Sequence, residues 1–179
     1  WLMRAEAEEV NVGFLTRMRT GRPFVRVKVG MSLDGRTALA NGESKWITGE
    51  AARADVQHWR ARASAVLTGI GTVLADDPQL NVRTPGAWRQ PLRVVLDTNL
   101  RTPPTARILE GEPKTVIFTA AAAGGAVDPR LRDRAQLEPL AVGARAQALG
   151  AVLTRLGALG FARPRTRALT ACCSYRQLC

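Results

Sequence analysis

The first thirty residues change from a helical to an alternating pattern. Residues 4–19 predict one short helix, and Gly21 followed by Pro23 marks its end, since glycine and proline favour helix termination. From Phe24 onward, valines occupy every second position up to Val29, which predicts a strand with a valine face. The first structural boundary of the chain is expected at this change of period.

Two turn signals follow this strand. Asp34–Gly35 and Asn41–Gly42 are both dipeptides typical of tight turns. The residues between them, 36–40, predict a short strand. Asp34 is interpreted as a turn former.

A second helix is predicted after these turns. Thr48 stands where an N-cap is expected, and Glu50 would lie in the first turn, where a negative side chain meets the positive end of the helix dipole. Apolar residues then recur at spacings of four, three and four: Ala52, Val56, Trp59 and Ala63. Arg60 lies at the edge of this stripe, where its guanidinium can reach into a cleft.

Three later apolar runs predict buried strands, at residues 65–68, 92–97 and 115–119. The first leads into a glycine turn, and the order strand, helix, strand favours a crossover unit. A last amphipathic helix is predicted over residues 144–159. Its apolar stripe consists of Leu149, Val152, Leu153, Leu156 and Leu159. These elements together predict an α/β fold.

Composition is typical of a globular chain of about one domain. The chain has 179 residues, of which 46% are hydrophobic. No run approaches the roughly 18 apolar residues of a membrane span, and acidic residues stand near the N-terminus where a secretory signal would be basic. We therefore expect a cytoplasmic protein without a membrane partner.

The formal net charge of +11 by itself suggests a polyanionic partner. Its distribution changes that interpretation, because residues 139–179 carry six arginines and no acid, more than half of the excess. Arginine outnumbers lysine 23 to 3, which fits a GC-rich coding sequence as well as phosphate binding. A basic nucleic-acid-binding protein is therefore the disfavoured alternative, since no aromatic and basic residues interleave.

Residues 161–179 follow neither period. They hold four arginines and all three cysteines, which lack a C-x-x-C spacing, and the only histidine is His58. No metal site is predicted from such a set. We expect no buried strand from this segment, so that the stripe of the preceding helix would stay uncovered and drive association. A frame-shifted reading of the gene is preferred over a specialised tail.

Candidate catalytic and binding residues lie at one predicted helix start and at one predicted glycine turn. Ser44, Trp46 and Thr48 precede the second helix, whose free amides favour an anion, although capping and packing alone explain them as well. Gly69-x-Gly71-Thr72 lacks the third glycine of a dinucleotide fingerprint. The acid pair Asp76–Asp77 strengthens the interpretation of this glycine turn as a ligand site, because ligands of open α/β sheets bind beyond the carboxyl ends of strands.

Two other positions stay open on local grounds. Lys28 on the first strand either lies beside a ligand or, more commonly, is solvated. Residues 97–99, at the end of a buried strand, form either a turn or the wall of a site.

Four segments in one order resemble a known family. They are RPFVRVKVGMSLDGRTA (22–38), GESKWITG (42–49), LTGIGTVLADDPQLNVR (67–83) and PLRVVLD (91–97). Over about residues 20–160 the chain resembles the reductase domain of the bifunctional bacterial riboflavin-biosynthesis deaminase-reductase.

The resemblance implies a dihydrofolate-reductase-like α/β fold, a sheet flanked by helices, with NADPH as cofactor. The implied reaction reduces 5-amino-6-(5-phosphoribosylamino)uracil to 5-amino-6-(5-phosphoribitylamino)uracil. The positions that match substrate-binding residues are Ser44, Arg60, Leu80 and Arg83. Those that match cofactor-binding residues are Gly30, Trp46, Thr72, Asp76 and Thr98. Lys28 and Asp76 match the catalytic positions near the reacting sugar.

The same resemblance divides the chain. Residues 1–22 resemble the last helix and linker of the deaminase half, and 23–160 the N-terminal part of the reductase domain. Residues 161–179 replace the strand and the Glu-x-Gly segment expected next, so the fold is expected to be incomplete at its C-terminus and the chain poorly active. Deamination is not predicted. The alternative is a non-catalytic remnant with partial ligand binding, and a homodimer is a further option.

Overall fold

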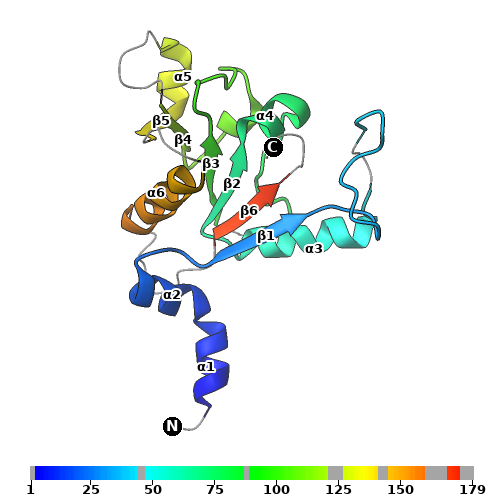
Figure 1. Cartoon of the computed structure of the whole chain (residues 1–179), viewed down its shortest axis with the longest axis vertical. Coiled ribbons are helices and arrows are strands. Elements are labelled where there is room, and N and C mark those ends of the chain that lie inside the picture. Colours follow the sequence, from blue (N-terminus) through cyan, green and yellow to red (C-terminus); the bar gives the residue numbers. More distant parts are fainter. Residues whose placement is uncertain are drawn as a thin grey trace.

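The computed structural model describes residues 3–43, 47–86, 89–120, 127–140, 145–159 and 169–173. Within these ranges, six parallel strands form one sheet in the order β1-β6-β2-β3-β4-β5 (Figure 1). The strands are β1 (Val25–Val29), β2 (Ala65–Gly69), β3 (Leu92–Leu96), β4 (Thr115–Thr119), β5 (Ala135–Pro139) and β6 (Leu169–Cys173). The predicted α/β class and the strands at 65–68, 92–97 and 115–119 are confirmed.

Helices connect these strands. They are α1 (Arg4–Val10), α2 (Val12–Thr20), α3 (Glu50–Ala61), α4 (Ile70–Asp76), α5 (Pro129–Arg134) and α6 (Arg145–Ala158), with a 3-10 turn η1 at Arg107–Leu109. The sequence analysis missed α4, which starts directly from Gly69, and also α5 and β5. The strand expected at 36–40 is wrong, because this stretch consists of bends and turns.

Alternating side chains of the central strands fill two cores. Val66, Val95 and Ile117 point to the face covered by α4, η1 and α5, while Leu67, Val94 and Phe118 point to the face covered by α6. This period of two with apolar residues on both faces explains the continuous apolar runs in the sequence, since parallel strands are buried on both sides.

The apolar stripe of α6 lies against the second of these faces. Val152 and Leu156 are buried beside Leu67 and Phe118, whereas Leu149 is 43% exposed. The expectation that this stripe stays uncovered is therefore wrong. The strands that cover it are β2, β3 and β4, which come before α6 in the chain.

β6 also corrects the interpretation of the last residues. Its backbone pairs with β1 on one side and β2 on the other, with Ala171 opposite both Val27 and Leu67. The expectation that 161–179 supplies no strand is wrong, because the arginines of this segment lie outside the uncharged run 169–173. The assignment of 1–22, 23–160 and 161–179 to separate origins stays a prediction.

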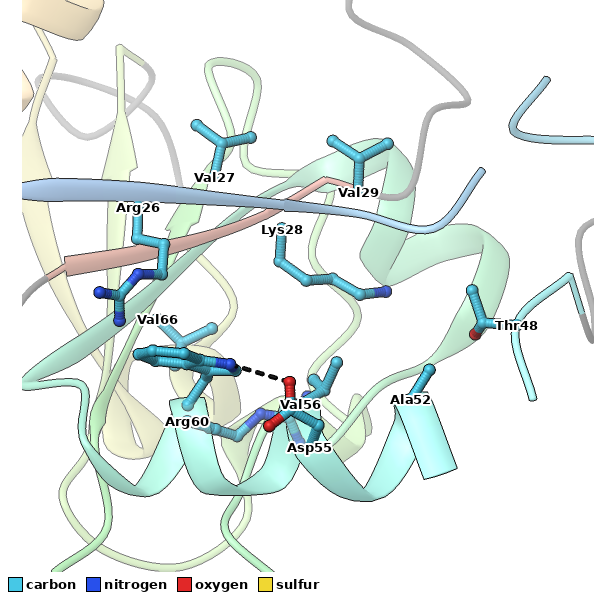
Figure 2. A pocket seen from close by; sticks show the side chains of 11 residues that line it. Arg26, Val27, Lys28, Val29, Thr48, Ala52, Asp55, Val56, Arg60 and Val66 are labelled. Carbon is cyan, nitrogen blue, oxygen red and sulfur yellow. Dashed lines mark hydrogen bonds between the residues drawn. The ribbon is translucent and has the colours of Figure 1, made fainter. Parts of the chain in front are cut away.

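The valine face of β1 faces outward. Val27 is 63% exposed, and no β1 residue belongs to the core that α6 covers. Arg26 and Lys28 instead point from β1 toward α3, on the opposite side from Val27 and Val29 (Figure 2). The alternation of β1 was predicted correctly, but its polar side is the one that faces a helix.

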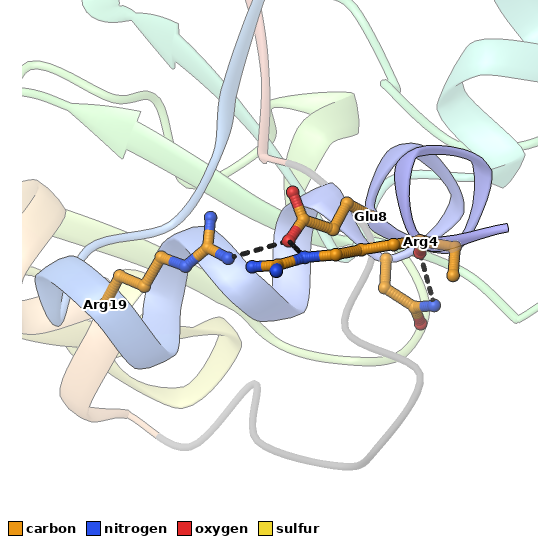
Figure 3. Close-up of polar contacts among 5 residues, drawn as sticks. Arg4, Glu8 and Arg19 are labelled. Atoms are coloured by element: carbon orange, nitrogen blue, oxygen red, sulfur yellow. Dashed lines mark hydrogen bonds and ion pairs between the residues drawn. The ribbon is translucent and has the colours of Figure 1, made fainter. Parts of the chain in front are cut away.

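The N-terminal helices stand apart from the sheet. The single helix predicted over 4–19 is wrong, because the chain bends at Asn11 between α1 and α2. Glu8 accepts hydrogen bonds at 3.2 Å from both Arg4 and Arg19, which joins the two helices (Figure 3). These two hydrogen bonds, from Arg4 first, lower the pKa of Glu8. No residue of α1 is buried, and α1 projects away from the sheet in Figure 1.

The predicted helix end at Gly21 and the predicted turn at Asp34–Gly35 are confirmed, whereas the predicted N-cap at Thr48 is wrong. Gly21 ends α2 with a φ of 68°. The Asp34–Gly35 turn closes through a 2.9 Å bond from the Gly35 amide to the Ser32 carbonyl, and the Ser32 hydroxyl lowers the pKa of Asp34. Thr48 does not cap α3, because Gly49 is the N-cap, and the Thr48 carbonyl accepts from Arg53 at 2.6 Å instead.

Gly157 in α6 approaches the end of α2 closely, and we expect Gly157→Ala to lower the free energy of unfolding by about 1–3 kcal/mol. A Cβ there would overlap the Gly21 carbonyl oxygen and lie 3.2 Å from its carbon, and Arg17 donates to the Gly157 carbonyl at 3.0 Å. Urea denaturation followed by circular dichroism measures the effect.

Gly150 provides the matched control in the same helix. A Cβ there meets nothing within 4 Å, so Gly150→Ala is expected to stabilise by about 0.5–1 kcal/mol through helix propensity. Equal effects of the two substitutions would contradict the close approach of α6 to residue 21.

Candidate active site

The candidate residues gather at the carboxyl edge of the sheet. Gly30 follows β1, Thr72 lies in the first turn of α4 directly after β2, and Thr98 follows β3 by two residues. Because all strands are parallel, these three positions lie at one edge. Ligands of open α/β sheets bind at this edge.

A cavity of about 340 Å³ lies between β1 and α3 (Figure 2). Lys28 enters it from the strand, while Arg60 and Asp55 line it from the helix. Its apolar side chains are those of Ala52, Val56 and Val66, with Thr48 at one end. Val27 and Val29 also line it, although their side chains point to the other side of β1 (Figure 2). The structure therefore brings two predicted site residues, Lys28 and Arg60, into one cavity.

Trp59 is a cavity residue that the sequence analysis assigned only to the core. The guanidinium carbon of Arg26 lies 3.9 Å from the centre of its ring, and that of Arg62 lies 5.1 Å away. Its indole nitrogen donates to the Asp55 carboxylate at 2.9 Å. The sequence could have indicated that Arg26 reaches this cavity, because Arg26 lies on the same face of the predicted strand as Lys28.

The charges lining the cavity favour an anion. Arg26, Lys28 and Arg60 are cationic, whereas Asp55 is the one carboxylate among the lining residues. Asp55 is already engaged by the indole of Trp59. A guanidinium and an ammonium close together are the usual partners of phosphate groups.

Gly30 leaves room beside the Lys28 side chain. A Cβ at this position would lie 3.4 Å from the Lys28 Nζ and 3.9 Å from the Thr48 Cγ2. The absent side chain keeps open the space between the two residues. A ligand can therefore approach the backbone at Gly30.

Arg60 also connects the cavity to the segment 80–83. It donates to the Asn81 carbonyl at 2.8 Å, and the Arg83 amide donates to the Gln57 side chain at 3.2 Å. Leu80 is 5% exposed and packs in the core. Its side chain is therefore not open to a ligand, so the contact predicted for Leu80 is left to its main chain.

The two acids at the end of α4 lie in different surroundings. Asp77 accepts from the Arg107 amide at 2.9 Å and thereby joins α4 to η1. Asp76 is half-buried in the last turn of α4, while Thr72 is buried in the first turn. Asp76 therefore stays the candidate of the pair for chemistry.

The end of β3 places Thr98 on the surface. Its carbonyl accepts from the Thr119 hydroxyl and the Ala120 amide, both at 3.1 Å. The preceding Asp97 is fully buried and accepts from the amide and hydroxyl of Thr102, both at 2.7 Å. Residues 97–102 therefore form a closed loop that presents Thr98.

Ser44 and Trp46 lie outside the described residues. Among the residues that the structure does describe, no three His, Cys, Asp or Glu side chains come together as a metal site. In the same ranges, no helix has the length and apolar content needed to cross a membrane.

A parallel α/β domain with a cationic cavity between its first strand and α3 fits the class of small-ligand-binding α/β folds. Comparison with known families then identifies the chain. It belongs to the family described as the RibD C-terminal domain, whose model matches residues 23–159. The likeness to dihydrofolate reductase expected for this fold holds for the family.

Curated relatives and solved structures agree with this membership. The chain is 52% identical over 134 residues to the riboflavin biosynthesis protein RibD of Bacillus amyloliquefaciens, covering 74% of this chain and 35% of that protein. The RibD of Escherichia coli is 51% identical over 121 residues, covering 61% and 33%. The chain thus spans about a third of the length of these relatives.

Among solved structures, RibD of Acinetobacter baumannii is 43% identical with a TM-score of 0.73, covering 93% of this chain and 44% of that one. A diaminohydroxyphosphoribosylaminopyrimidine deaminase/5-amino-6-(5-phosphoribosylamino)uracil reductase of Thermotoga maritima is 28% identical with a TM-score of 0.75, covering 96% and 44%. The fold described above is therefore shared with the matched part of these proteins.

Proposed function

We propose that this chain reduces 5-amino-6-(5-phosphoribosylamino)uracil to its ribitylamino product with NADPH. The observation that carries the proposal is the cavity between β1 and α3, which holds Lys28 and Arg60 and lies beside Gly30. The membership of residues 23–159 in the RibD C-terminal family supports it. The name of the Thermotoga maritima relative includes this reductase activity.

The residues at the sheet edge fit a dinucleotide cofactor. Gly30 leaves room for close approach, and two buried oxygens at the ends of β2 and β3, Thr68 Oγ1 and Asp97 Oδ1, have no hydrogen-bond partner among the described residues. We assign Gly30, Trp46, Thr72, Asp76 and Thr98 to the cofactor. When bound, NADPH supplies the hydride.

We assign the substrate to the side of the cavity away from the residues assigned to the cofactor. We assign Arg60 and Arg83 to its phosphate, because guanidinium groups match phosphate oxygens in fork geometry. Ser44 and the main chain of Leu80 complete the assigned contacts. Lys28 and Asp76 are the assigned catalytic residues, with Lys28 beside the reacting sugar.

The expectation of poor activity rested in part on an uncovered α6. Since β2, β3 and β4 bury that helix, this part of the argument no longer applies. The non-catalytic remnant is therefore the less favoured alternative. A cytoplasmic location and a homodimer stay predictions of the sequence.

The test is NADPH oxidation, followed by absorbance, with the ribosylaminouracil phosphate as substrate. We expect turnover by the chain, and we expect Arg60→Ala and Arg83→Ala each to lower kcat/KM by the equivalent of about 1.5–3 kcal/mol, the usual contribution of charge-assisted hydrogen bonds. Arg132→Ala, an exposed arginine on α5, is the matched control and should leave kcat/KM unchanged.

Two results would count against this proposal. Absence of NADPH oxidation by the unsubstituted chain, with a rise in its melting temperature in millimolar NADPH, would favour the non-catalytic remnant, and absence of both would also remove cofactor binding. Unchanged kinetics in both arginine variants would remove Arg60 and Arg83 from the site.

A further inference from the structure

The segment 81–83 is held by side chains instead of by a neighbouring strand. Val82 donates its amide to the Gln90 side-chain oxygen at 2.8 Å, and its carbonyl accepts from the Gln90 side-chain nitrogen at 3.1 Å. One amide side chain thus satisfies both backbone groups of Val82. A glutamine suits this role because its amide carries a donor and an acceptor side by side.

The residues on either side of Val82 are bound to α3. The Asn81 carbonyl accepts from Arg60 at 2.8 Å, and the Arg83 amide donates to Gln57 at 3.2 Å. Four consecutive backbone groups, from the Asn81 carbonyl to the Arg83 amide, are therefore bound by three side chains. Two of these side chains, Gln57 and Arg60, lie on one helix.

The backbone leading into this segment lies in an uncommon conformation. Asp77 and Leu80 have positive φ angles of 39° and 51° without being glycine. Such conformations persist only where surrounding contacts determine them. Asp77 is held by the Arg107 amide and Leu80 by the core, so the chain enters residue 81 in a fixed direction, and the glutamine contacts hold the residues that follow.

We infer that Gln57 and Gln90 are positioning residues that hold the backbone of 81–83 so that Arg83 faces the substrate phosphate. The inference rests on the proposed function, since it assigns Arg83 to that phosphate. Neither glutamine needs to touch the substrate. Each acts by fixing the direction in which the Arg83 side chain leaves the backbone.

The hydrogen bonds from Gln57 and Gln90 to the backbone of residues 82–83 form a glutamine clamp. The variants Gln90→Leu and Gln57→Leu each remove one side of this clamp, whereas Gln57→Glu keeps the oxygen that accepts from the Arg83 amide. Gln79→Leu is the matched control, because Gln79 bonds only to the Glu110 side chain among the contacts described for it, at 3.1 Å. The first readout is hydrogen exchange at the Val82 and Arg83 amides in the free protein. The second is steady-state kinetics with both substrates.

We expect the Val82 amide in Gln90→Leu and the Arg83 amide in Gln57→Leu to exchange faster. In both variants the KM for the pyrimidine should rise about tenfold, the scale of one or two lost hydrogen bonds, while the KM for NADPH and kcat change less than about twofold. Gln57→Glu and Gln79→Leu should behave like the unsubstituted protein. A purely structural role would not separate the two KM values in this way.

Three results would overturn the inference. Turnover by the unsubstituted protein with an unchanged pyrimidine KM in both leucine variants would leave the reductase function intact and exclude the positioning role. Unchanged exchange at both amides would exclude the clamp itself. Absence of turnover in the unsubstituted protein would overturn the proposed function and this inference together.

Discussion

Replacing Arg93 by Met is expected to lower the free energy of unfolding by about 3–5 kcal/mol, the scale of losing a charged donor that makes several hydrogen bonds. Arg93 lies on β3 with only 4% of its surface exposed. It donates to the carbonyls of Glu110, Gly111 and Pro113, with a bond of 2.7 Å to Gly111. Without the guanidinium, three carbonyls in the turn before β4 lose their donor, and the Met side chain cannot replace it.

The charge of Arg93 is part of this contact. Burial lowers the pKa of Arg93, and the nearby carboxylates of Glu112 and Glu110 oppose that shift. Arg93→Lys keeps a charge, but an ammonium cannot span the three carbonyls as a planar guanidinium does. We therefore expect Arg93→Lys to fall between Arg93→Met and the unsubstituted protein.

Urea denaturation followed by circular dichroism measures the effect of these substitutions. Arg134→Met is the matched control, because Arg134 donates to a single carbonyl, that of Pro104, at 2.7 Å and is half-buried. Arg134→Met should lower the free energy of unfolding by about 0.5–1.5 kcal/mol, the usual net contribution of one hydrogen bond. Equal losses in Arg93→Met and Arg134→Met would show that the three-carbonyl contact has no special weight.

The sequence predicted the central strands well because both of their faces are buried. Short apolar runs such as those around Leu67, Val94 and Ile117 are typical of strands that lie between two helical layers. These residues do fill the cores on the two faces of the sheet. The orientation of β1 could not be predicted in the same way. Its alternation defines two faces, but only the position of α3 decides that Lys28 faces a helix and Val27 faces outward.

Short elements were missed where local signals are weak. α5 has six residues, and β5 has the sequence AQLEP, which contains neither a β-branched nor an aromatic residue. β6 was missed because the arginines and cysteines of 161–179 were judged as one composition. Parallel pairing depends on the backbone, so five uncharged residues are enough to fill the place between β1 and β2.

The candidate site was predictable as a set of residues but not as a geometry. The family resemblance supplied Lys28, Arg60 and Arg83, whereas Gln57 and Gln90 carry no motif of their own. Their role depends on which backbone groups they reach, and Gln90 acts on a residue eight positions away. Such contacts exist only once the chain is folded.

Replacing Lys28 by Met is expected to lower kcat of the proposed reductase by about 10²–10³-fold, the range of a lost general acid. Lys28 reaches from β1 into the cavity, and its Nζ lies beside the space left open by Gly30. Opening of the ribosylamino ring breaks the bond between C1′ and the ring oxygen, which takes up a proton, and leaves a C1′=N iminium that accepts the hydride. An ammonium beside that oxygen can deliver the proton.

The fold should tolerate this substitution. Arg26 and Arg60 line the same cavity, so removing one of three cationic side chains relieves repulsion and leaves the unfolding midpoint in urea unchanged or slightly higher. The rise in melting temperature caused by NADPH should persist, because Gly30 and Thr72 are unaltered. Lys114→Met, at an exposed lysine before β4, is the matched control and should keep full kcat. A Lys28→Met variant with the kcat of the control would remove Lys28 from catalysis and reduce its role to charge in the cavity.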